Sequence, residues 1–548
     1  MTNERLQAIE QIKSGDKWDL IVVGGGILGA GIYAYAAQLG LKVLLLEQKD
    51  FAWGSSSKSS KMVHGGLRYI SQGQIGLTKE SVEERQKLLE CGQGLVEPAN
   101  YVMSHYKGQF PSKGLFGLLM HIYGFFAGGR QHKSLSKVDY QMLSPGCNPF
   151  GVKGGALTGG TQYTDALTDD ARLVYRLIQQ GNLLSGVSLN YCKVIGLLRE
   201  AERVTGVRAK FDDAFASDAS DSKELKELKE LQIPAKLVVN ASGAWSDQLD
   251  SQVLLRPLRG SHILVPQWRL PVFNVVTLLH PRDKRPVMIY PWQNTTLIGT
   301  TDIDHSDSLS KEPKMTADEL EYIFELVKAE FPAAKLTKDD VISSYAGVRP
   351  IVLDKPLNKE VSASDEKRTH SVFEQAGLFT VCGGKLTTFR VIAEEVLQKS
   401  TKSLGLSTPL PPFEIFANAN EQELESHYYL AGRYGAKVSE YLQEFAQGVN
   451  DNLWHQIRHA PTIWLELVIA AKYEQVHHLD DLLLRRTRLG NVLPQGGIDI
   501  LDEVEQLCSP YLAWDKARWQ QERERYLQIW QAYYSLPQDM PQKVPQDV

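Results

Sequence analysis

Two histidines and several basic side chains have the types and settings needed to bind and deprotonate a small anionic molecule. His64 precedes a Gly-Gly step, and His262 follows a Gly-Ser step. An imidazole titrates near pH 6.5, which suits a general base at neutral pH, although histidines also serve as structural residues. Guanidinium groups bind phosphate oxygens bidentately and stay charged. Arginine and lysine side chains of the chain are therefore candidates for holding an anion, with structural ion pairing as the alternative.

A glycine-rich turn within residues 19–31 predicts a dinucleotide site. Gly24, Gly26 and Gly29 fit the pattern G-x-G-x-x-G, and Glu47 ends the next apolar run. Glycines allow a tight turn and close backbone approach, and the helix N-terminus that follows attracts a pyrophosphate. The Glu47 carboxylate would accept hydrogen bonds from ribose hydroxyls and repel a 2′-phosphate, which disfavours NADP. The loop alone leaves FAD and NAD open.

The elements that must position these residues follow a strand and helix pattern. Residues 19–23 and 41–47 read as buried strands on either side of a helix, which is one βαβ unit. Similar strands at 237–240 and 378–382 end in small residues, and a helix begins near Thr387. Because ligands of open α/β sheets lie where strand ends meet helix starts, these segments predict one nucleotide site assembled from distant parts of the chain.

The rest of the chain predicts two further units. Alternating apolar runs between 256 and 375 indicate an antiparallel sheet that would bind the substrate, and helical periodicity follows from 403. We therefore expect an α/β protein with a discontinuous dinucleotide-binding domain (17–110, 151–255 and 376–402), a cap domain (256–375) and a helical C-terminal domain (403–548). The charged stretch 217–231 is expected to be a solvated surface helix or hairpin tip.

Composition excludes several classes of protein. A net charge of -5 offers no general attraction to nucleic acid. The 5 cysteines form no CxxC pair, so neither a zinc site nor a disulfide framework is expected, and a reducing compartment fits best. The charged first eighteen residues do not resemble a secretion signal, and no run approaches the roughly 20 apolar residues of a membrane-spanning helix.

A serine-rich run at 54–61 and the segment 62–69, MVHGGLRY, favour FAD over NAD. Enzymes that bind NAD have no evident use for such a segment directly after the ribose-binding strand. Its hydroxyl and N–H groups suit the second half of a pyrophosphate, and the Gly-Gly step would let the backbone lie close to a flat ring. An ordinary serine-rich loop is the alternative.

Over nearly its whole length the chain resembles the FAD-dependent glycerol-3-phosphate dehydrogenase family. The matching stretches are 19–31 (DLIVVGGGILGAG), 59–69 (SSKMVHGGLRY), 168–174 (TDDARLV), 238–245 (VVNASGAW), 259–266 (RGSHILVP), 298–302 (IGTTD), 345–350 (YAGVRP), 383–390 (GGKLTTFR) and 478–490 (HLDDLLLRRTRLG). The chain departs from the family at Leu28, where Asn is usual, at Ala244, where Pro is common, and in the 217–231 insertion. Leu28 in place of Asn would alter how the backbone N–H groups at the start of the helix after the loop are hydrogen-bonded.

The resemblance implies FAD and an oxidation of sn-glycerol 3-phosphate to dihydroxyacetone phosphate, by hydride transfer to flavin N5. It also implies delivery of the electrons to membrane quinone, and attachment to the cytoplasmic face of the cell membrane. Three alternative functions fit parts of the same sequence pattern: a glycerol-3-phosphate oxidase that uses oxygen, an FAD amino-acid or amine oxidase, and a non-catalytic flavin-binding protein. The electron acceptor cannot be read from the residues.

The resemblance also assigns site residues. Those expected to contact FAD are Gly24, Gly26, Ile27, Leu28, Gly29, Glu47, Gln48, Ser55, Ser56, Ser57, Ser60, Lys61, His64, Gly65, Ala241, Ser242, Gly243, Gly384, Lys385, Leu386 and Thr387. Those expected to contact the substrate or assist catalysis are His64, Arg68, Tyr69, His262, Arg349, Arg368 and Lys385. Lys385 has a second reading, in which it stabilises negative charge on the reduced flavin. Which residue is the general base stays open, and no metal site is expected.

One apolar segment is a candidate for membrane contact. Residues 113–130 (KGLFGLLMHIYGFFAGGR) carry leucines and aromatic residues between basic ends, which suits a helix lying in the plane of the bilayer surface and a route for quinone. A core helix or a dimer-interface helix is the alternative, and the latter allows a homodimer. Residues 518–534 are expected to form a packing helix.

Overall fold

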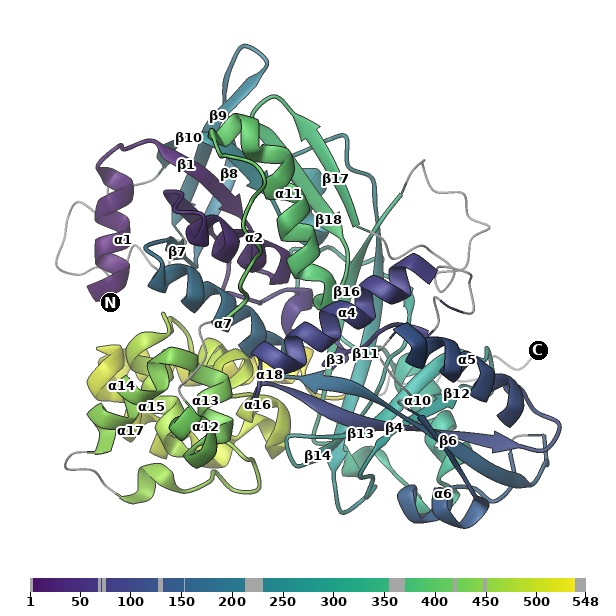
Figure 1. Cartoon of the computed structure of the whole chain (residues 1–548). Helices are drawn as coiled ribbons and strands as arrows, with labels where there is room; N and C mark the ends of the chain where they lie inside the picture. Colours follow the sequence, from purple (N-terminus) through teal and green to yellow (C-terminus); the bar gives the residue numbers. More distant parts are fainter. Residues whose placement is uncertain are drawn as a thin grey trace, which may run out of the picture.

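The computed structural model describes residues 3–67, 70, 75–126, 132–151, 153–211, 230–353, 370–416, 421–446 and 451–537 (Figure 1). Three of the predicted site residues, Arg68, Tyr69 and Arg368, lie outside these ranges, as does nearly all of the 217–231 insertion.

The first sheet contains the predicted βαβ unit. The strand β1 (Trp18–Val23), the helix α2 (Ile27–Gln38) and the strand β2 (Val43–Leu46) follow one another, and β1 pairs in parallel with both β2 and β10. The strand order is β17-β18-β10-β1-β2-β7, with a β8–β9 hairpin joined through β10. The remaining strands are β7 (Val187–Leu189), β8 (Cys192–Glu200), β9 (Arg203–Phe211), β10 (Leu231–Asn240), β17 (His370–Gln375) and β18 (Leu378–Gly383).

Helices cover both faces of this sheet. On one face α2, α7 (Asp170–Leu183) and α11 (Phe389–Leu404) bury their apolar residues in a common core. On the other face lies α1 (Asn3–Lys13), where the sequence suggested only a polar leader. Its buried residues Ala8, Ile9 and Ile12 pack in a second core with strand residues, which gives this segment a reason to fold.

The second sheet is antiparallel except for the parallel pairing of β12 with β4. Its strands are β3 (Met62–Val63), β4 (Val96–Tyr106), β5 (His132–Leu135), β6 (Leu157–Thr168), β11 (Leu255–Pro266), β12 (Val275–Leu279), β13 (Pro286–Trp292), β14 (Thr295–Gly299), β15 (Ile303–Asp304) and β16 (Ser343–Val352). The associated helices are α4 (Ile75–Cys91), α5 (Lys113–Phe126), α6 (Lys137–Leu143) and α10 (Ala317–Glu330).

Sheet membership differs from the predicted domain boundaries at four strands, β4, β6, β17 and β3, the last of which pairs with β6 in the second sheet. The strands β4 and β6 pair with each other and belong to the second sheet, although both fell inside the ranges assigned to the dinucleotide-binding domain. Conversely, β17 pairs with β18 in the first sheet, although the boundary at 375 assigned it to the cap. Alternation of apolar and polar residues predicts a strand but carries no information about which sheet the strand joins, so these crossings were missed.

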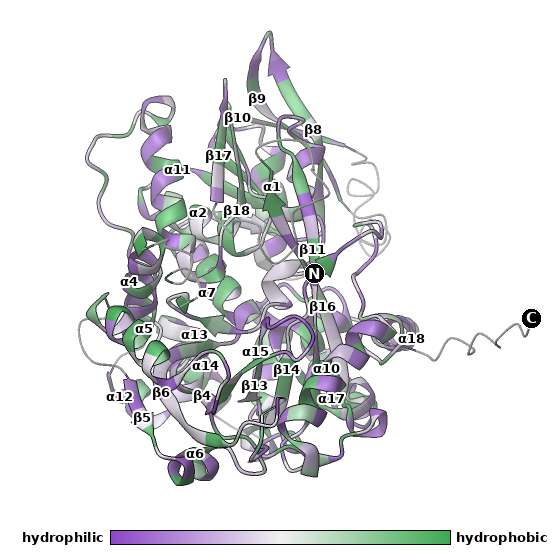
Figure 2. Ribbon diagram, turned by 90° about the vertical axis from the view of Figure 1, so that its right-hand side faces the viewer, coloured by the Kyte–Doolittle hydropathy of each residue, from purple (hydrophilic) through white to green (hydrophobic). Residues whose placement is uncertain are grey.

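The C-terminal part is helical, as expected, and packs beside α7 (Figure 1). Its helices are α12 (Glu421–Ser426), α13 (Tyr428–Tyr434), α14 (Val438–Ala446), α15 (Trp464–Tyr473), a π-helix (Asp481–Arg486), α16 (Leu489–Val492), α17 (Leu501–Leu512) and α18 (Lys516–Tyr533). The helix α18 is largely hydrophilic in colour (Figure 2), but it buries Trp519, Tyr526 and Trp530, as a packing helix should. Among the described helices, none combines the length and the apolarity that crossing a bilayer requires.

Candidate active site

A cavity of about 960 Å³ lies where the two sheets meet. One wall is formed by the carboxyl ends of the parallel strands, through Val23, Glu47, Ala241 and Gly383. The second sheet forms the opposite wall. Ligand pockets commonly hold roughly 300–1,000 Å³, so this cavity has room for a large cofactor together with a small substrate.

The glycine-rich loop has the geometry of a phosphate cradle. Gly24 adopts a φ of +110°, and a Cβ there would lie 2.6 Å from the Ala241 carbonyl oxygen. A Cβ at Gly29 would overlap the Gly24 carbonyl oxygen, so the third glycine is required for packing of the turn on its own helix. The start of α2 faces the cavity, since Gly26 and Ile27 line it. Its positive end and its N–H groups favour a pyrophosphate at this place.

Glu47 and Ser56 fix the shape of this loop. The Glu47 carboxylate accepts from the backbone N–H groups of Gly25 (2.7 Å) and Lys49 (2.9 Å). Burial raises the pKa of the Glu47 carboxyl, and these hydrogen bonds oppose the shift. Ser56 Oγ accepts from the N–H of Ile27 at 2.9 Å, so a side chain from the serine run caps the first turn of α2. Both side chains line the cavity and are placed where a ribose and a pyrophosphate would lie.

The serine run is held against the cavity from behind by the second sheet. Tyr345 Oη donates to the Ser59 carbonyl oxygen at 2.9 Å, and Tyr290 Oη donates to the Ser60 carbonyl oxygen at 2.5 Å. Ser55 Oγ donates to the Val348 carbonyl oxygen. The loop is therefore fixed by the strands β13 and β16, so its polar groups face a ligand from a rigid support.

A basic cluster lies at the end of the cavity formed by the second sheet. Arg349 Nη1 pairs with Asp302 Oδ1 at 2.9 Å, and Arg349 Nη2 donates to Thr300 Oγ1 at 3.3 Å. Arg285, which immediately precedes β13, approaches the same residue, and its Nη1 donates to the Asp302 carbonyl oxygen at 3.0 Å. Arg349, Arg285 and Lys284 all line the cavity, as does Lys385 from the loop after β18.

Most of the predicted site residues that the structure describes line this one cavity. They are Gly24, Gly26, Ile27, Leu28, Glu47, Gln48, Ser55, Ser56, Ser60, His64, Ala241, Ser242, Gly243, Arg349, Gly384, Lys385, Leu386 and Thr387. Those placed behind the cavity wall are Gly29, Ser57, Lys61, Gly65 and His262. Gly65 donates its N–H to Tyr123 Oη (3.1 Å) and Asp165 Oδ1 (3.2 Å), so it shapes the wall from behind.

His262 is a buried residue that supports the serine run. Its Nε2 lies 2.9 Å from Ser60 Oγ, and its ring stacks on Tyr345 with centroids 4.7 Å apart. Burial, with smaller contributions from Lys61 and Arg349, lowers the pKa of His262 well below its ordinary value. The ring is therefore neutral at neutral pH and reaches the cavity only through Ser60. The sequence pattern could not distinguish this position from that of His64, which does line the cavity.

Lys61 is likewise turned into the protein. Its ammonium contacts both Asp170 oxygens at 2.9 Å and donates to the Ser57 carbonyl oxygen at 2.7 Å. Burial lowers the pKa of Lys61 to about 8, against the opposing effect of Asp170. Lys61 was expected to contact FAD, but its side chain does not line the cavity, and its ammonium forms a buried ion pair instead.

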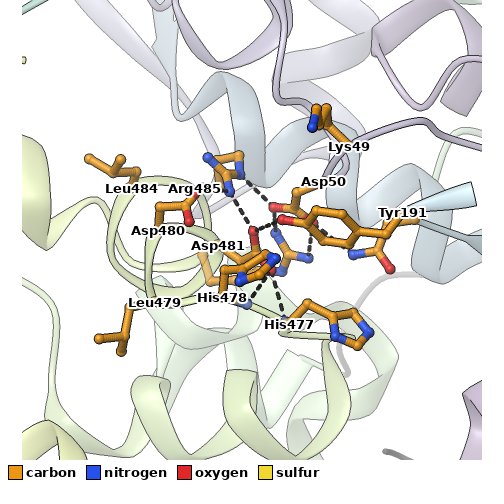
Figure 3. Close-up of polar contacts among 12 residues, drawn as sticks. Lys49, Asp50, Tyr191, His477, His478, Leu479, Asp480, Asp481, Leu484 and Arg485 are labelled. Carbon is orange, nitrogen blue, oxygen red and sulfur yellow. Dashed lines mark hydrogen bonds and ion pairs between the residues drawn. The ribbon is translucent and has the colours of Figure 1, made fainter. Parts of the chain in front are cut away.

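A network of buried charges joins the C-terminal helices to the cofactor loops. Asp50, three residues after Glu47, pairs with Arg485 (2.5 Å) and Arg486 (2.8 Å). Figure 3 shows Asp50, Tyr191, Asp481 and Arg485 pointing toward one another. Although burial alone would raise it, Arg486 and Arg485 hold the pKa of Asp50 below its ordinary value. The segment HLDDLLLRRTRLG therefore fixes the loop that follows β2.

Sequence reasoning missed several residues of the cavity. Arg285 and Asp302 belong to it through the pairing of β13 and β14, which no local pattern reveals. Asp165 lines it as well, held by Tyr123 Oη at 2.6 Å and by Arg85. An apolar arm extends toward α5 and was not anticipated as part of the site; it is lined by Tyr101, Met103, Phe110, Phe116, Leu119 and Tyr163.

Comparison with known proteins agrees with this geometry. Residues 19–398 match the family model described as FAD dependent oxidoreductase, and residues 393–519 match the C-terminal domain of alpha-glycerophosphate oxidase. The chain belongs to the FAD-dependent oxidoreductase family, and the protein is an enzyme that uses FAD. The glycines, the capped start of α2 and the size of the cavity fit this cofactor.

Its relatives narrow the group within that family. Glycerol-3-phosphate dehydrogenase of Mycobacterium leprae is 32 % identical over 537 residues, covering 91 % of this chain and 86 % of that protein. Aerobic glycerol-3-phosphate dehydrogenase of Staphylococcus aureus is 29 % identical over 542 residues, covering 92 % of each. The crystal structure of the glycerol-3-phosphate dehydrogenase from Bacillus halodurans complexed with FAD has the same fold, with a TM-score of 0.73 at 24 % identity over 96 % of this chain and 97 % of that one.

Proposed function

We propose that this enzyme oxidises sn-glycerol 3-phosphate to dihydroxyacetone phosphate and passes the electrons to a membrane quinone. The observation that carries the proposal is the single cavity that joins a dinucleotide cradle to a cluster of guanidinium groups. Such a cluster suits a phosphate dianion, because planar guanidinium groups bind phosphate oxygens bidentately. An amino-acid oxidase would need one cation for a carboxylate and has no use for the second.

The chain's own residues divide the work between binding and proton transfer. Arg349 holds the phosphate, and Lys385 lies beside the cofactor loop with its ammonium 3.3 Å from Ser81 Oγ. His64 takes the proton of the C2 hydroxyl, since it lines the cavity whereas His262 stands behind Ser60. FAD, when bound, accepts the two electrons. The residues after β18, from Gly384 to Thr387, and those after β10, from Ala241 to Gly243, hold it from the first sheet.

The acceptor part of the proposal rests on α5. One side of this helix is buried through Phe116, Met120 and Tyr123, and Phe116 lines the apolar arm of the cavity. The other side exposes Leu115, Leu118, Ile122 and Phe125. An apolar helix face continuous with an apolar arm suits docking on the inner leaflet and entry of a quinone. Oxygen is the competing acceptor, because the matching C-terminal family model is named for an oxidase.

Anaerobic reduction of the flavin tests the substrate. The purified holoenzyme is mixed with glycerol 3-phosphate without oxygen, and the flavin absorption band should bleach. D-amino acids serve as the comparison and should leave the band unchanged. An intact band with glycerol 3-phosphate, in a sample that dithionite does bleach, would refute the proposed substrate. Reoxidation by a quinone and by oxygen is then followed in parallel; faster reoxidation by oxygen would refute the quinone step.

A further inference from the structure

We propose that Arg285 supplies the second guanidinium of the substrate-phosphate subsite, and that Asp302 aligns it with Arg349. The inference rests on the proposed function, since it concerns how that site selects a phosphate ester. Of the two arginines, the resemblance to the dehydrogenase family pointed only to Arg349, and no sequence motif singles out Arg285.

Asp302 lies between the two guanidinium groups. Its side chain is 1 % exposed, and one carboxylate oxygen faces each arginine: Oδ1 lies 2.9 Å from Arg349 Nη1, and Oδ2 lies 3.6 Å from Arg285 Nη2. Arg285 Nη1 also donates to the Asp302 carbonyl oxygen at 3.0 Å. One residue therefore orients both cations, which would otherwise repel each other.

The sheet holds this arrangement in place. Arg285 immediately precedes β13 and Asp302 shortly follows β14, and these strands are paired, with Met288 opposite Gly299. Arg349 lies in β16, which pairs with β11 next to β14. Binding groups on paired strands are held more rigidly than groups on loops. Gly260 of β11 provides the space that the Arg349 guanidinium occupies, because a Cβ at this position would lie 2.8 Å from both terminal nitrogens of Arg349.

Arg285 keeps donors for a ligand. Within the described part of the chain it pairs with Asp302 alone, and a guanidinium carries five N–H donors. Its side chain is 16 % exposed and lines the cavity, so donors not used by Asp302 are available there. Lys284 adds a further positive charge to the cavity wall, and the only other carboxylate among these neighbours, Asp283, accepts from Tyr322 Oη at 3.0 Å.

The charge balance favours a dianion. Two guanidinium groups and one ammonium face two carboxylates, so this end of the cavity has a positive excess that an incoming phosphate monoester compensates. Two planar groups on one phosphate also set its orientation, which a single arginine does not do. We infer that Arg285 contributes to selection of a phosphorylated polyol over the same polyol without phosphate.

Substitution of Arg285 by Gln tests the inference, with Arg282→Gln as the matched control. Arg282 is three residues away, pairs with Glu325 and Glu321 at the surface and does not line the cavity. Anaerobic flavin bleaching is measured against glycerol 3-phosphate concentration. Loss of a charge-assisted contact should raise the half-saturating concentration about 10- to 100-fold in Arg285→Gln. The limiting bleaching rate should change little, and the control should match the wild type.

Unphosphorylated glycerol distinguishes loss of a phosphate contact from a general loss of activity in the variant. Its slow bleaching of the flavin should be equal in the wild type and in Arg285→Gln, and Arg285→Lys should restore part of the affinity for the phosphate ester. An unchanged half-saturating concentration in Arg285→Gln would overturn the inference. So would loss of FAD from that variant, because the arginine would then be structural. If the wild type itself is not bleached by glycerol 3-phosphate, the proposed function fails and not merely the role of Arg285.

Discussion

At the scale of single residues, the site depends on glycines that cannot be replaced and on a cap supplied from another segment. Leu28 is a departure from the resemblance, which implied Asn at this position, and Ser56 Oγ accepts from the first N–H of α2. The helix start is thus satisfied from the serine run. Because Ser56 belongs to the serine run, this hydrogen bond holds the serine run and the glycine-rich loop together.

Gly29→Ala tests the cradle. The added methyl group would overlap the Gly24 carbonyl oxygen, so the turn must open before FAD can lie on it. We expect the affinity for FAD, measured by fluorescence titration of the apoprotein, to fall at least about tenfold, which corresponds to roughly 1.4 kcal/mol. Gly76→Ala in α4 is the control, since nothing lies within 4 Å of its Cβ. Full retention of FAD by Gly29→Ala would show that this loop does not bind the cofactor.

The predicted site residues that line the cavity are those whose neighbours along the chain carry the signal. The glycine loop, the serine run and the segment around Lys385 bring their own turn and strand contexts, and all reach the cavity. Arg285 could not be found, and Asp302 was given no role although it ends the matching stretch 298–302, because only strand pairing brings the two residues together. His262 shows the converse: its flanking residues resemble those of a site residue, but its ring lies behind Ser60 and does not line the cavity.

At the scale of elements, the segment 480–488 connects the C-terminal helices to both cofactor loops. Arg485 and Arg486 pair with Asp50, while Arg488 pairs with Asp169 at 2.9 Å and with Asp170. Arg488 Nη1 also donates to the Ser57 carbonyl oxygen at 3.1 Å. Periodicity predicted a helical domain here, but it could not predict that the domain would anchor the serine run through buried charges.

Arg488→Gln should be strongly destabilising. The substitution removes one cationic partner of the buried carboxylates Asp169 and Asp170. Breaking a buried ion pair in this way should lower the free energy of unfolding by about 3–5 kcal/mol. Unfolding by urea measures the effect. Arg458→Gln provides the contrast, because Arg458 pairs with Asp499 at 2.8 Å with both side chains about half exposed, and such pairs contribute roughly 0–1 kcal/mol. Equal losses for the two variants would mean that the buried network adds no more than a surface pair.

The end of α10 carries a pH-dependent element. Glu330 is 7 % exposed, and Tyr106 Oη donates to its Oε2 at 3.3 Å. Burial raises the pKa of the Glu330 carboxyl to about 7, against smaller opposing effects of Tyr106 and Lys284. The folded state therefore binds this proton more tightly than the unfolded state, so the free energy of unfolding falls as pH rises from the ordinary glutamate value through 7.

Glu330→Gln should remove that dependence. Urea unfolding is measured for the variant and the wild type between pH 6 and pH 8. Other groups also titrate in this interval, but their contributions cancel when the two free energies of unfolding are subtracted. The stability of the variant relative to the wild type should increase by roughly 1 kcal/mol over this interval, since one pKa unit corresponds to about 1.4 kcal/mol. A constant difference would show that Glu330 is already ionised at pH 6.

At the scale of the whole molecule, α5 joins the cavity to an exposed apolar face, because Phe116 and Leu119 of this helix line the cavity. The face consists of Leu115 (43 % exposed), Leu118 (59 %), Ile122 (38 %) and Phe125 (82 %), and Phe110 (73 %) adjoins it. Phe110 also lines the apolar arm of the cavity. Under the proposed function, an acceptor that leaves the bilayer at this face would have an apolar path toward the flavin.

Leu118→Glu combined with Phe125→Glu tests this arrangement. Burying each side chain in the interface should contribute about 1.5–3 kcal/mol, so binding to vesicles containing anionic lipid should weaken at least about a hundredfold. Co-sedimentation measures the binding, and Ile498→Glu is the control, since Ile498 lies in the C-terminal part and is 44 % exposed.

Bleaching by glycerol 3-phosphate should be unaffected in the double variant, because neither side chain lines the cavity. Reduction of a quinone embedded in the vesicles should fall with the binding. Undiminished vesicle binding would refute docking through α5. A changed oligomeric state of the double variant would then assign this face of α5 to a protein interface.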